Sequence, residues 1–134
     1  MVEFPWVPVT TEEGIKYLPL GEIDIQTRMG DWMTFGFKLD SGADMTLMEE
    51  QDCCTLGYTV NDCKEQQYSS VNNDGHTCYV RGFNIRIGDN IIEDVPIAFS
   101  KEPIQVLLLG RKRVLDCLEM CFYGVKKRTI FRQI

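Results

Sequence analysis

The clearest hydrophobic pattern in the chain repeats every second residue. Between positions 32 and 39, Phe35, Phe37 and Leu39 are apolar and are separated by single small or polar residues. This alternation is typical of a β-strand with one buried face. We therefore predict a strand over residues 32–39 that ends immediately before Asp40.

Similar patterns along the rest of the chain predict mostly short strands. Pro96 indicates that one of these strands is in part an edge strand. The run at 105–109, which is continuously apolar from Val106 onward, is typical of a strand buried on both faces. Further strands are expected over residues 18–26, 68–71, 77–81, 83–87, 91–99, 119–123 and 129–132, with residues 45–48 extended or beginning a new element. The fold class is all-β.

Two short helices are expected among these strands. Acidic residues at 49–52 favour the first turn of a helix, and Gly57 would end that helix. Residues 111–118 have helical spacing. A helix that begins at Arg111 would place three positive charges at its positive end, which costs about 0.3–1 kcal/mol for each charge. The alternative is that this helix begins later and its charges are solvated.

The first residues differ from the rest of the chain. Pro5 and Pro8 lie among apolar residues and predict an extended arm or an edge strand that packs through Trp6. The length of 134 residues suits one domain of ordinary size. We therefore expect an N-terminal arm over residues 1–17 and one domain over residues 18–134.

The charge and hydropathy of the chain exclude several classes of partner. The formal net charge is −6, which argues against nucleic acid or an anionic membrane surface as the main partner. The sequence contains neither an apolar segment long enough to cross a bilayer nor the features of a signal peptide. A soluble, cytoplasmic protein is expected.

The cysteines fit neither a paired zinc motif nor a small disulfide scaffold. Free thiols are therefore expected, with no metal and no cofactor. Oxidised Cys53–Cys54 or Cys117–Cys121 pairs remain open, as does a thiol or metal protein, which would contain stoichiometric zinc. The six cysteines are Cys53, Cys54, Cys63, Cys78, Cys117 and Cys121.

The turn that follows the 32–39 strand is the main candidate for chemistry. Ser41 and Gly42 interrupt the extended chain, because glycine tolerates unusual backbone angles and serine hydrogen-bonds to its neighbours. Asp40 is therefore expected on a tight turn at the end of a half-buried strand, where its carboxylate is held rigidly and is partly removed from water. Residues 39–50 read Leu-Asp-Ser-Gly-Ala-Asp and continue into Met-Thr-Leu-Met-Glu-Glu.

This run resembles the active-site segment of the retropepsins, the aspartic proteases of retroviruses and retrotransposons, whose motif is Asp-Thr/Ser-Gly-Ala. A second mark of that family, an apolar run that ends in Gly-Arg, corresponds to residues 106–111. The resemblance implies a retropepsin-like closed β-barrel or sandwich, the acid protease fold. It also implies an aspartic endopeptidase that binds a peptide or protein substrate.

The resemblance further implies a homodimer. Peptide-bond hydrolysis by this route needs two carboxylates that share one proton, and the chain contains one Asp-Ser-Gly sequence. A second copy of the chain would supply the second Asp40 across a two-fold axis. Asp40, Ser41 and Gly42 are the expected catalytic residues, and Ser41 would brace the pair of aspartates.

The same resemblance assigns roles to residues around the turn. Ala43 and Asp44 are expected to contact substrate, and Asp44 is expected to pair with Arg111. Asn73, Asp74 and Gly75 would form the tip of the flap, the β-hairpin that closes over bound peptide; the alternative is an ordinary exposed turn. An alternative function is a non-catalytic dimerisation or peptide-binding module that keeps the fold.

Overall fold

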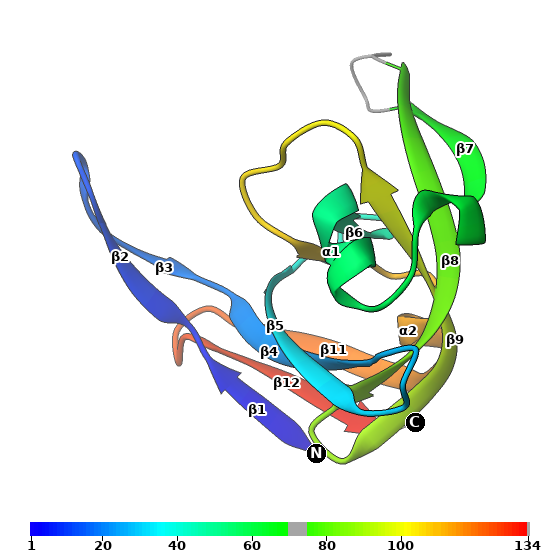
Figure 1. Ribbon diagram of the computed structural model, residues 1–134. Helices are drawn as coiled ribbons and strands as arrows, with labels where there is room; N and C mark the ends of the chain where they lie inside the picture. The colour runs from blue at the N-terminus through cyan, green and yellow to red at the C-terminus, as the bar shows by residue number, and fades with distance from the viewer. Residues whose placement is uncertain (70–74, 134) are drawn as a thin grey trace.

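The structure, a computed structural model, describes residues 1–69 and 75–133 and is built mainly from β-strands (Figure 1). Seven strands form the largest sheet in the order β4-β5-β10-β6-β9-β8-β7. An additional pairing of β4 with β8 closes six of these strands into a barrel, which confirms the predicted all-β class. The seven strands are β4 (Leu20–Gln26), β5 (Trp32–Leu39), β6 (Thr46–Glu49), β7 (Lys64–Ser69), β8 (Gly75–Ile87), β9 (Asn90–Ser100) and β10 (Leu108–Leu109).

Alternating side chains fill the barrel. Phe37 and Leu39 of β5 are buried, as the sequence pattern predicts, and they meet Ile23 and Ile25 of β4 in the same core cluster. The 83–87 segment and the 77–81 segment form the single strand β8, which is irregular between Phe83 and Ile85. The barrel therefore has one continuous apolar core beneath the Asp40 turn.

In the part of the chain that the structure describes, two short α-helices and one 3₁₀ turn accompany the barrel. Helix α1 (Glu50–Thr55) follows β6, and Gly57 ends it at a φ of +95°, as predicted. The 3₁₀ turn η1 (Val60–Asp62) precedes β7, and α2 (Val114–Cys117) precedes β11. Within residues 1–69 and 75–133, no helix is long and apolar enough to cross a membrane.

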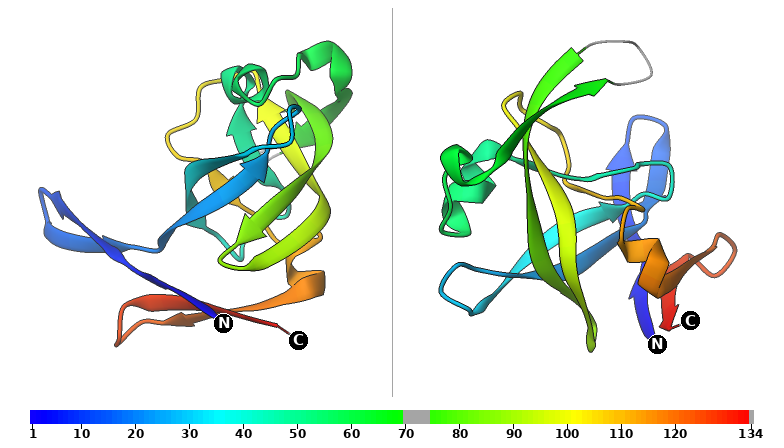
Figure 2. Two further views of the ribbon diagram at one scale, coloured as in Figure 1. Left: turned by 60° about the horizontal axis from the view of Figure 1, so that its bottom comes forward. Right: turned by 90° about the vertical axis from the view of Figure 1, so that its right-hand side faces the viewer.

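The two ends of the chain meet in a second sheet. Strand β12 (Arg128–Gln133) lies between β1 (Val2–Pro5) and β11 (Leu118–Tyr123), and all its pairings are antiparallel. Figure 2 shows the N- and C-termini side by side in both views. The predicted final hairpin is present, and the predicted edge strand near the N-terminus is β1.

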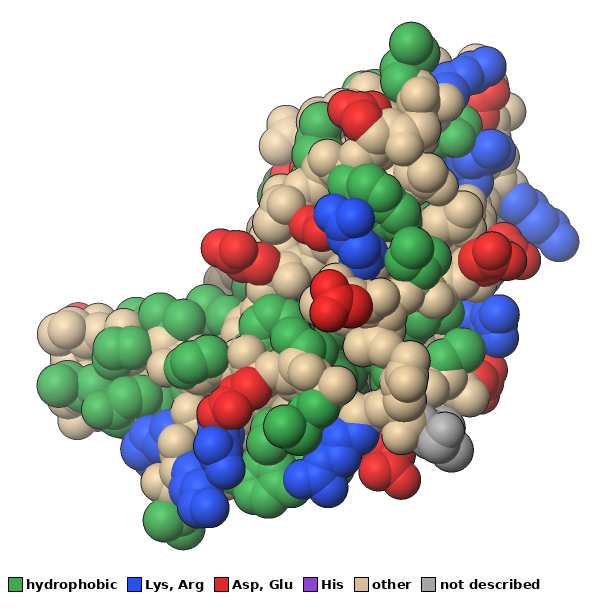
Figure 3. All heavy atoms as spheres, turned by 90° about the horizontal axis from the view of Figure 1, so that it is seen from below, with side chains coloured by type: hydrophobic (Ala, Val, Ile, Leu, Met, Phe, Trp, Pro, Cys, Tyr) green, Lys and Arg blue, Asp and Glu red, His purple; other side chains and the backbone are tan. Residues whose placement is uncertain are grey.

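Residues between β1 and the barrel form a projecting hairpin. Strands β2 (Val7–Thr11) and β3 (Gly14–Leu18) pair only with each other within the part of the chain that the structure describes. At the base of the hairpin, Trp6 donates a hydrogen bond from Nε1 to Thr129 Oγ1 across 2.8 Å, so the arm packs through Trp6 as expected. Figure 3 shows hydrophobic side chains along this projection, where Val7, Val9, Ile15 and Tyr17 are exposed.

Two predicted elements are shorter in the structure. The predicted 105–109 strand is reduced to Leu108–Leu109, because only these residues reach the ladder between β5 and β6, and Val106 is exposed. The predicted 111–118 helix begins at Val114, since Arg113 adopts a φ of +72°, and it ends where Leu118 joins β12. Pro96 lies one residue before β6 joins β9, on a part of β9 that pairs with β8 alone, as an edge position requires.

Candidate active site

Asp40 follows β5 at a point where the backbone is held from two sides. Its amide donates a hydrogen bond to Leu109 O across 3.1 Å, and the amide of Leu39 donates to Pro19 O across 2.8 Å. Strand β10 runs parallel to β5, so both strands end at the same edge of the sheet. This arrangement fixes the place where the chain leaves the barrel.

The turn itself orients the Asp40 carboxylate. The amide of Gly42 donates a hydrogen bond to Asp40 Oδ1 across 2.9 Å, and the amide of Ala43 donates to Asp40 O across 3.2 Å. Asp40 is half-buried, whereas Ser41 and Gly42 are exposed. A methyl group at Gly42 would lie only 3.2 Å from Asp40 Oδ1. A small residue therefore belongs at this position, as the sequence predicts.

Backbone amides at the Gly-Arg motif hydrogen-bond to the end of the same turn. The amide of Arg111 donates a hydrogen bond to Ala43 O, and the amide of Lys112 donates to Asp44 O, both across 2.9 Å. Gly110 lies so close to the chain that a Cβ atom there would be 2.4 Å from Met45 C. The two sequence motifs, 70 residues apart by their numbering, therefore form one structural unit.

The side chains of Asp44 and Arg111 also approach each other. Arg111 Nη2 lies 3.8 Å from Asp44 Oδ1, and the two side chains are 50% and 69% exposed, respectively. Exposed ion pairs at this separation contribute little to stability. The backbone hydrogen bonds of residues 111 and 112, rather than this ion pair, hold the turn in place.

The basic residues after Gly110 precede a helix rather than form its first turn. Helix α2 begins after Arg111, Lys112 and Arg113, which corrects the prediction that these charges lie in its first turn. All three side chains are exposed, and Arg113 Nε donates a hydrogen bond to Glu93 O across 3.1 Å. The helix starts later and the three side chains are exposed, in agreement with the alternative from the sequence.

The other predicted substrate contacts are only partly described. Ala43 is half-buried and Asp44 is exposed, and both lie in the Asp40 turn. Gly75 begins β8, which pairs with β7 as an antiparallel hairpin. The predicted flap-tip residues Asn73 and Asp74 lie outside the described residues.

Sequence reasoning missed the residue that links the two motifs inside the protein. Thr46 is 1% exposed, and its Oγ1 accepts a hydrogen bond from the amide of Gly110 across 3.1 Å. Thr46 and Met48 share the inner face of β6. The alternating pattern of this short strand was therefore the sequence feature that could have indicated that Thr46 is buried. A buried threonine on such a face needs a polar partner.

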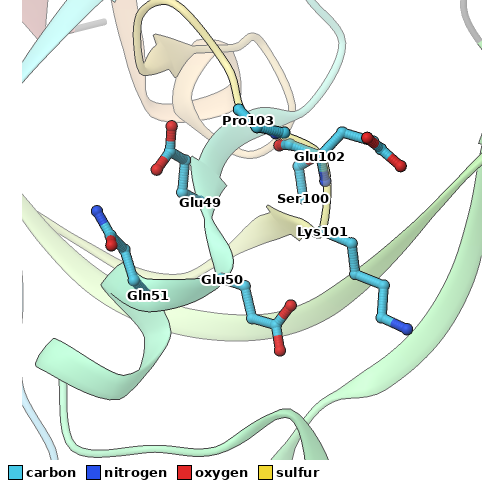
Figure 4. Close-up of a pocket in the computed structure, with 7 residues that line it drawn as sticks. All are labelled: Glu49, Glu50, Gln51, Ser100, Lys101, Glu102 and Pro103. Atoms are coloured by element: carbon cyan, nitrogen blue, oxygen red, sulfur yellow. The ribbon is translucent and has the colours of Figure 1, made fainter.

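The other hollows of the molecule are separate from the Asp40 turn. A pocket of about 180 Å³ lies between the β6–α1 junction and the loop that follows β9 (Figure 4). Several of its polar groups hold that loop, since Glu49 Oε1 accepts a hydrogen bond from the amide of Ile104 and Ser100 Oγ accepts one from the amide of Glu102. A more apolar hollow of about 270 Å³ lies at the base of the arm, beside Phe4, Val7 and Leu20.

The reactive groups of the turn are two carboxylates and one hydroxyl. Asp40 can accept or donate a proton, and the exposed Ser41 hydroxyl lies next to it in the chain. The second acid of the turn, Asp44, faces Arg111. Within the described ranges, no group of three or more His, Cys, Asp or Glu side chains is placed to share a metal ion. The turn therefore presents one half-buried carboxylate, Asp40, beside an exposed hydroxyl.

Comparisons with known proteins agree on the fold. The structure is similar to a retropepsin-like aspartic protease from Rickettsia conorii, with a TM-score of 0.60 and 16% sequence identity over 96% of this chain and 95% of that chain. It is also similar to the EIAV protease in complex with the inhibitor HBY-793, with a TM-score of 0.54 and 20% identity over 81% of this chain and 93% of that chain. These likenesses confirm the predicted retropepsin-like fold.

The sequence comparisons give the family. A search of curated proteins finds no match. The family model described as aspartyl protease matches residues 25–112, which include the Asp40 turn and the Gly-Arg motif. That span is about two thirds of the chain. The chain belongs to the aspartyl protease family.

Proposed function

We propose that the protein is an aspartic endopeptidase that works as a symmetric homodimer. The observation that carries this proposal is the geometry of the Asp40 turn, where one half-buried carboxylate is held by the amide of Gly42 at the end of a clamped strand. Family membership and the retropepsin-like fold support it. Residues 18–134 would form the protease domain, and residues 1–17 would form its N-terminal arm.

The need for a second copy follows from the chemistry. Hydrolysis of a peptide bond without a covalent nucleophile needs one group to take a proton from water and another to give a proton to the carbonyl oxygen. Two carboxylates about 3 Å apart cannot both ionise, so one remains protonated and the pair does both tasks. One Asp40 from each copy, related by a two-fold axis, would form this pair.

The remaining roles follow from position around the turn. The Ser41 hydroxyl would brace the two aspartates across the interface, and Gly42 would let the substrate backbone approach closely. Ala43 and Asp44 would line the cleft beside them. Extended peptide would bind as an added strand, with its side chains entering pockets on alternate sides.

The hairpin of β7 and β8 would close over this peptide. Asn73, Asp74 and Gly75 would form its tip, and closure would exclude water from the scissile bond. The Asp44–Arg111 pair would help to hold the turn near the interface, as a supplement to the backbone hydrogen bonds.

Peptide cleavage tests the proposal directly. The purified protein is incubated with a mixed peptide library between pH 4 and 7, and the products are identified by mass spectrometry. Asp40→Asn removes the carboxylate, whereas Asp89→Asn makes the same change in an exposed turn and serves as the matched control. We expect cleavage by the wild type and Asp89→Asn but not by Asp40→Asn.

Two other outcomes would overturn the proposal. Cleavage by the Asp40→Asn variant at the wild-type rate would exclude the pair of aspartates. Absence of cleavage in all three proteins, with bound peptide detected by fluorescence anisotropy, would favour a peptide-binding module that keeps the fold. Thermal unfolding of each variant shows whether it remains folded.

A further inference from the structure

Two cysteines outside the Asp40 turn are in direct contact. Cys53 lies on α1 and Cys63 follows η1, and their sulfur atoms are 3.7 Å apart. Neither of the pairs left open by the sequence, Cys53–Cys54 or Cys117–Cys121, forms a bond, since all six cysteines are free. The fold therefore brings together Cys53 and Cys63, whose contact could not be predicted from the spacing of the cysteines in the sequence.

We propose that Cys53 and Cys63 form a reversible disulfide site that reacts with peroxides. A disulfide bond is about 2.05 Å long, so the sulfur atoms need to approach by less than 2 Å from their present distance. The η1 turn and its neighbouring loop connect the two cysteines, and Cys63 directly precedes the edge strand β7. This inference concerns a different site and does not depend on the proposed protease activity.

The surroundings give the two thiols different roles. Cys53 is completely buried, whereas Cys63 is partly exposed and can meet a small oxidant first. Burial, together with the negative charge of Asp62, raises the pKa of Cys63 above its ordinary value, and a hydrogen bond from Cys53 and the positive charge of Arg81 offset only part of that rise. Burial raises the pKa of Cys53 to about 12. Cys63 is therefore the thiol that reacts first, and Cys53 is the thiol that closes the bond.

Arg81 is well placed to assist Cys63. Its guanidinium stacks over the Tyr58 ring at 4.1 Å, and its Nη1 donates a hydrogen bond to Asp62 O across 3.1 Å, next to Cys63 in the chain. Its Nε is buried and has no hydrogen-bond partner among the described residues. Arg81 thus holds a fixed positive charge beside the thiol, which favours the thiolate.

The reaction has two balanced steps. The Cys63 thiolate attacks one oxygen of hydrogen peroxide, the O–O bond breaks, and the departing hydroxide takes up a proton to become water, which leaves a sulfenic acid on Cys63. The Cys53 sulfur then attacks the Cys63 sulfur, the S–O bond breaks, and the Cys53 proton leaves with the hydroxyl group as a second water. Two thiols are oxidised to one disulfide, and one peroxide is reduced to two waters.

Mass spectrometry of the peroxide-treated protein tests the inference. Cys53, Cys54 and Cys63 lie between Lys38 and Lys64, with no other tryptic site between them, so trypsin releases all three in one peptide. The experiment therefore uses the full chain carrying Cys54→Ser, which leaves two cysteines in that peptide. The matched control carries both Cys54→Ser and Cys63→Ser.

Disulfide formation should lower the mass of this peptide by about 2 Da, and dithiothreitol should restore it. The control should not show this loss. The reaction should accelerate as pH rises, because more Cys63 is then thiolate, and the oxidised protein should melt about 5 °C higher because the closed loop restricts the unfolded chain. Peptide that keeps both thiols free for alkylation, or gains only oxygen on single cysteines, would overturn the inference.

Discussion

The amide of Gly110 donates a hydrogen bond to the buried hydroxyl of Thr46 across 3.1 Å. Gly110 directly follows β10, and Thr46 begins β6 after the Asp40 turn. The bond therefore joins the two family motifs inside the protein, where a donor without a partner would be costly. This internal link, together with the backbone bonds of residues 111 and 112, positions Asp40.

Removal of the Thr46 hydroxyl should destabilise the fold. Thr46→Val keeps the shape of the side chain but leaves the Gly110 amide without its acceptor, so the free energy of unfolding should fall by about 1–3 kcal/mol. Thr46→Ser keeps the hydroxyl and should retain more of the stability. Urea denaturation measures both variants, and equal stability of Thr46→Val and wild type would contradict the importance of this bond.

Addition of one methyl group at Gly110 should be more harmful. A Cβ atom at this position would lie 2.4 Å from Met45 C and 2.5 Å from Met45 O, which are backbone atoms that cannot move aside independently. Gly110→Ala should therefore lower the free energy of unfolding by about 3 kcal/mol or more. Gly36→Ala is the control, because a Cβ atom there meets no atom within 4 Å. Similar urea midpoints for the two variants would refute the predicted clash.

Loss of the Arg111 side chain should have a small effect. The Asp44–Arg111 pair is exposed at a separation of 3.8 Å, and such pairs contribute about 0–1 kcal/mol. Arg111→Ala keeps the backbone amide that binds Ala43 O, so the turn should remain in place. If urea denaturation showed a loss as large as that of Thr46→Val, the side-chain ion pair would matter more than the backbone clamp.

The pairing of β4 with β8, which closes the barrel, should become less stable at acidic pH. Asp24 of β4 accepts hydrogen bonds from Arg86 Nε across 2.9 Å and from Thr34 Oγ1 across 2.6 Å, and Arg86 stacks on Trp32 at 4.6 Å. Burial alone would raise the pKa of Asp24, but these hydrogen bonds and the Arg86 charge outweigh burial and hold it below its ordinary value of 3.8.

A lowered folded-state pKa means that the carboxylate stabilises the protein fully above the unfolded-state pKa and loses this effect as pH falls through the folded-state value. Asp24→Asn should therefore be less stable than wild type by about 1–2 kcal/mol at pH 7, and the difference should shrink as pH falls below 3.8 and through the lowered folded-state pKa. Asp89→Asn, the same change in an exposed turn, is the control. Thermal unfolding across this pH range provides the measurement, and a difference that grows in acid would show the opposite linkage.

The local alternation of apolar and polar residues was sufficient to predict the strands that bury one face. Phe37 and Leu39 lie in the core as the pattern of β5 requires. The apolar run before Gly110 was misleading, because in the sheet only Leu108 and Leu109 pair with β5, and only Leu108 pairs with β6. The late start of α2 depends on the positive φ of Arg113, which no local pattern indicates.

The candidate site was predictable where chemistry and turn residues coincide in sequence, as they do at Asp40 and Gly42. Its supports were not, because they come from distant segments. Pro19 O and Leu109 O accept hydrogen bonds from residues 39 and 40 through backbone atoms, which carry no signal in residue type. The contact of Cys53 with Cys63 could not be predicted either, because it depends on how α1 and η1 pack.

Mixing of active and inactive chains tests the shared site most directly. Asp40→Asn protein is added to a constant amount of wild-type protein, subunits are allowed to exchange, and peptide cleavage is measured at saturating substrate. If each site needs Asp40 from both copies, an equal amount of the variant should reduce the rate to about one half, because random pairing leaves fewer dimers with two carboxylates. An unchanged rate at every ratio, with subunit exchange demonstrated, would contradict the homodimeric active site.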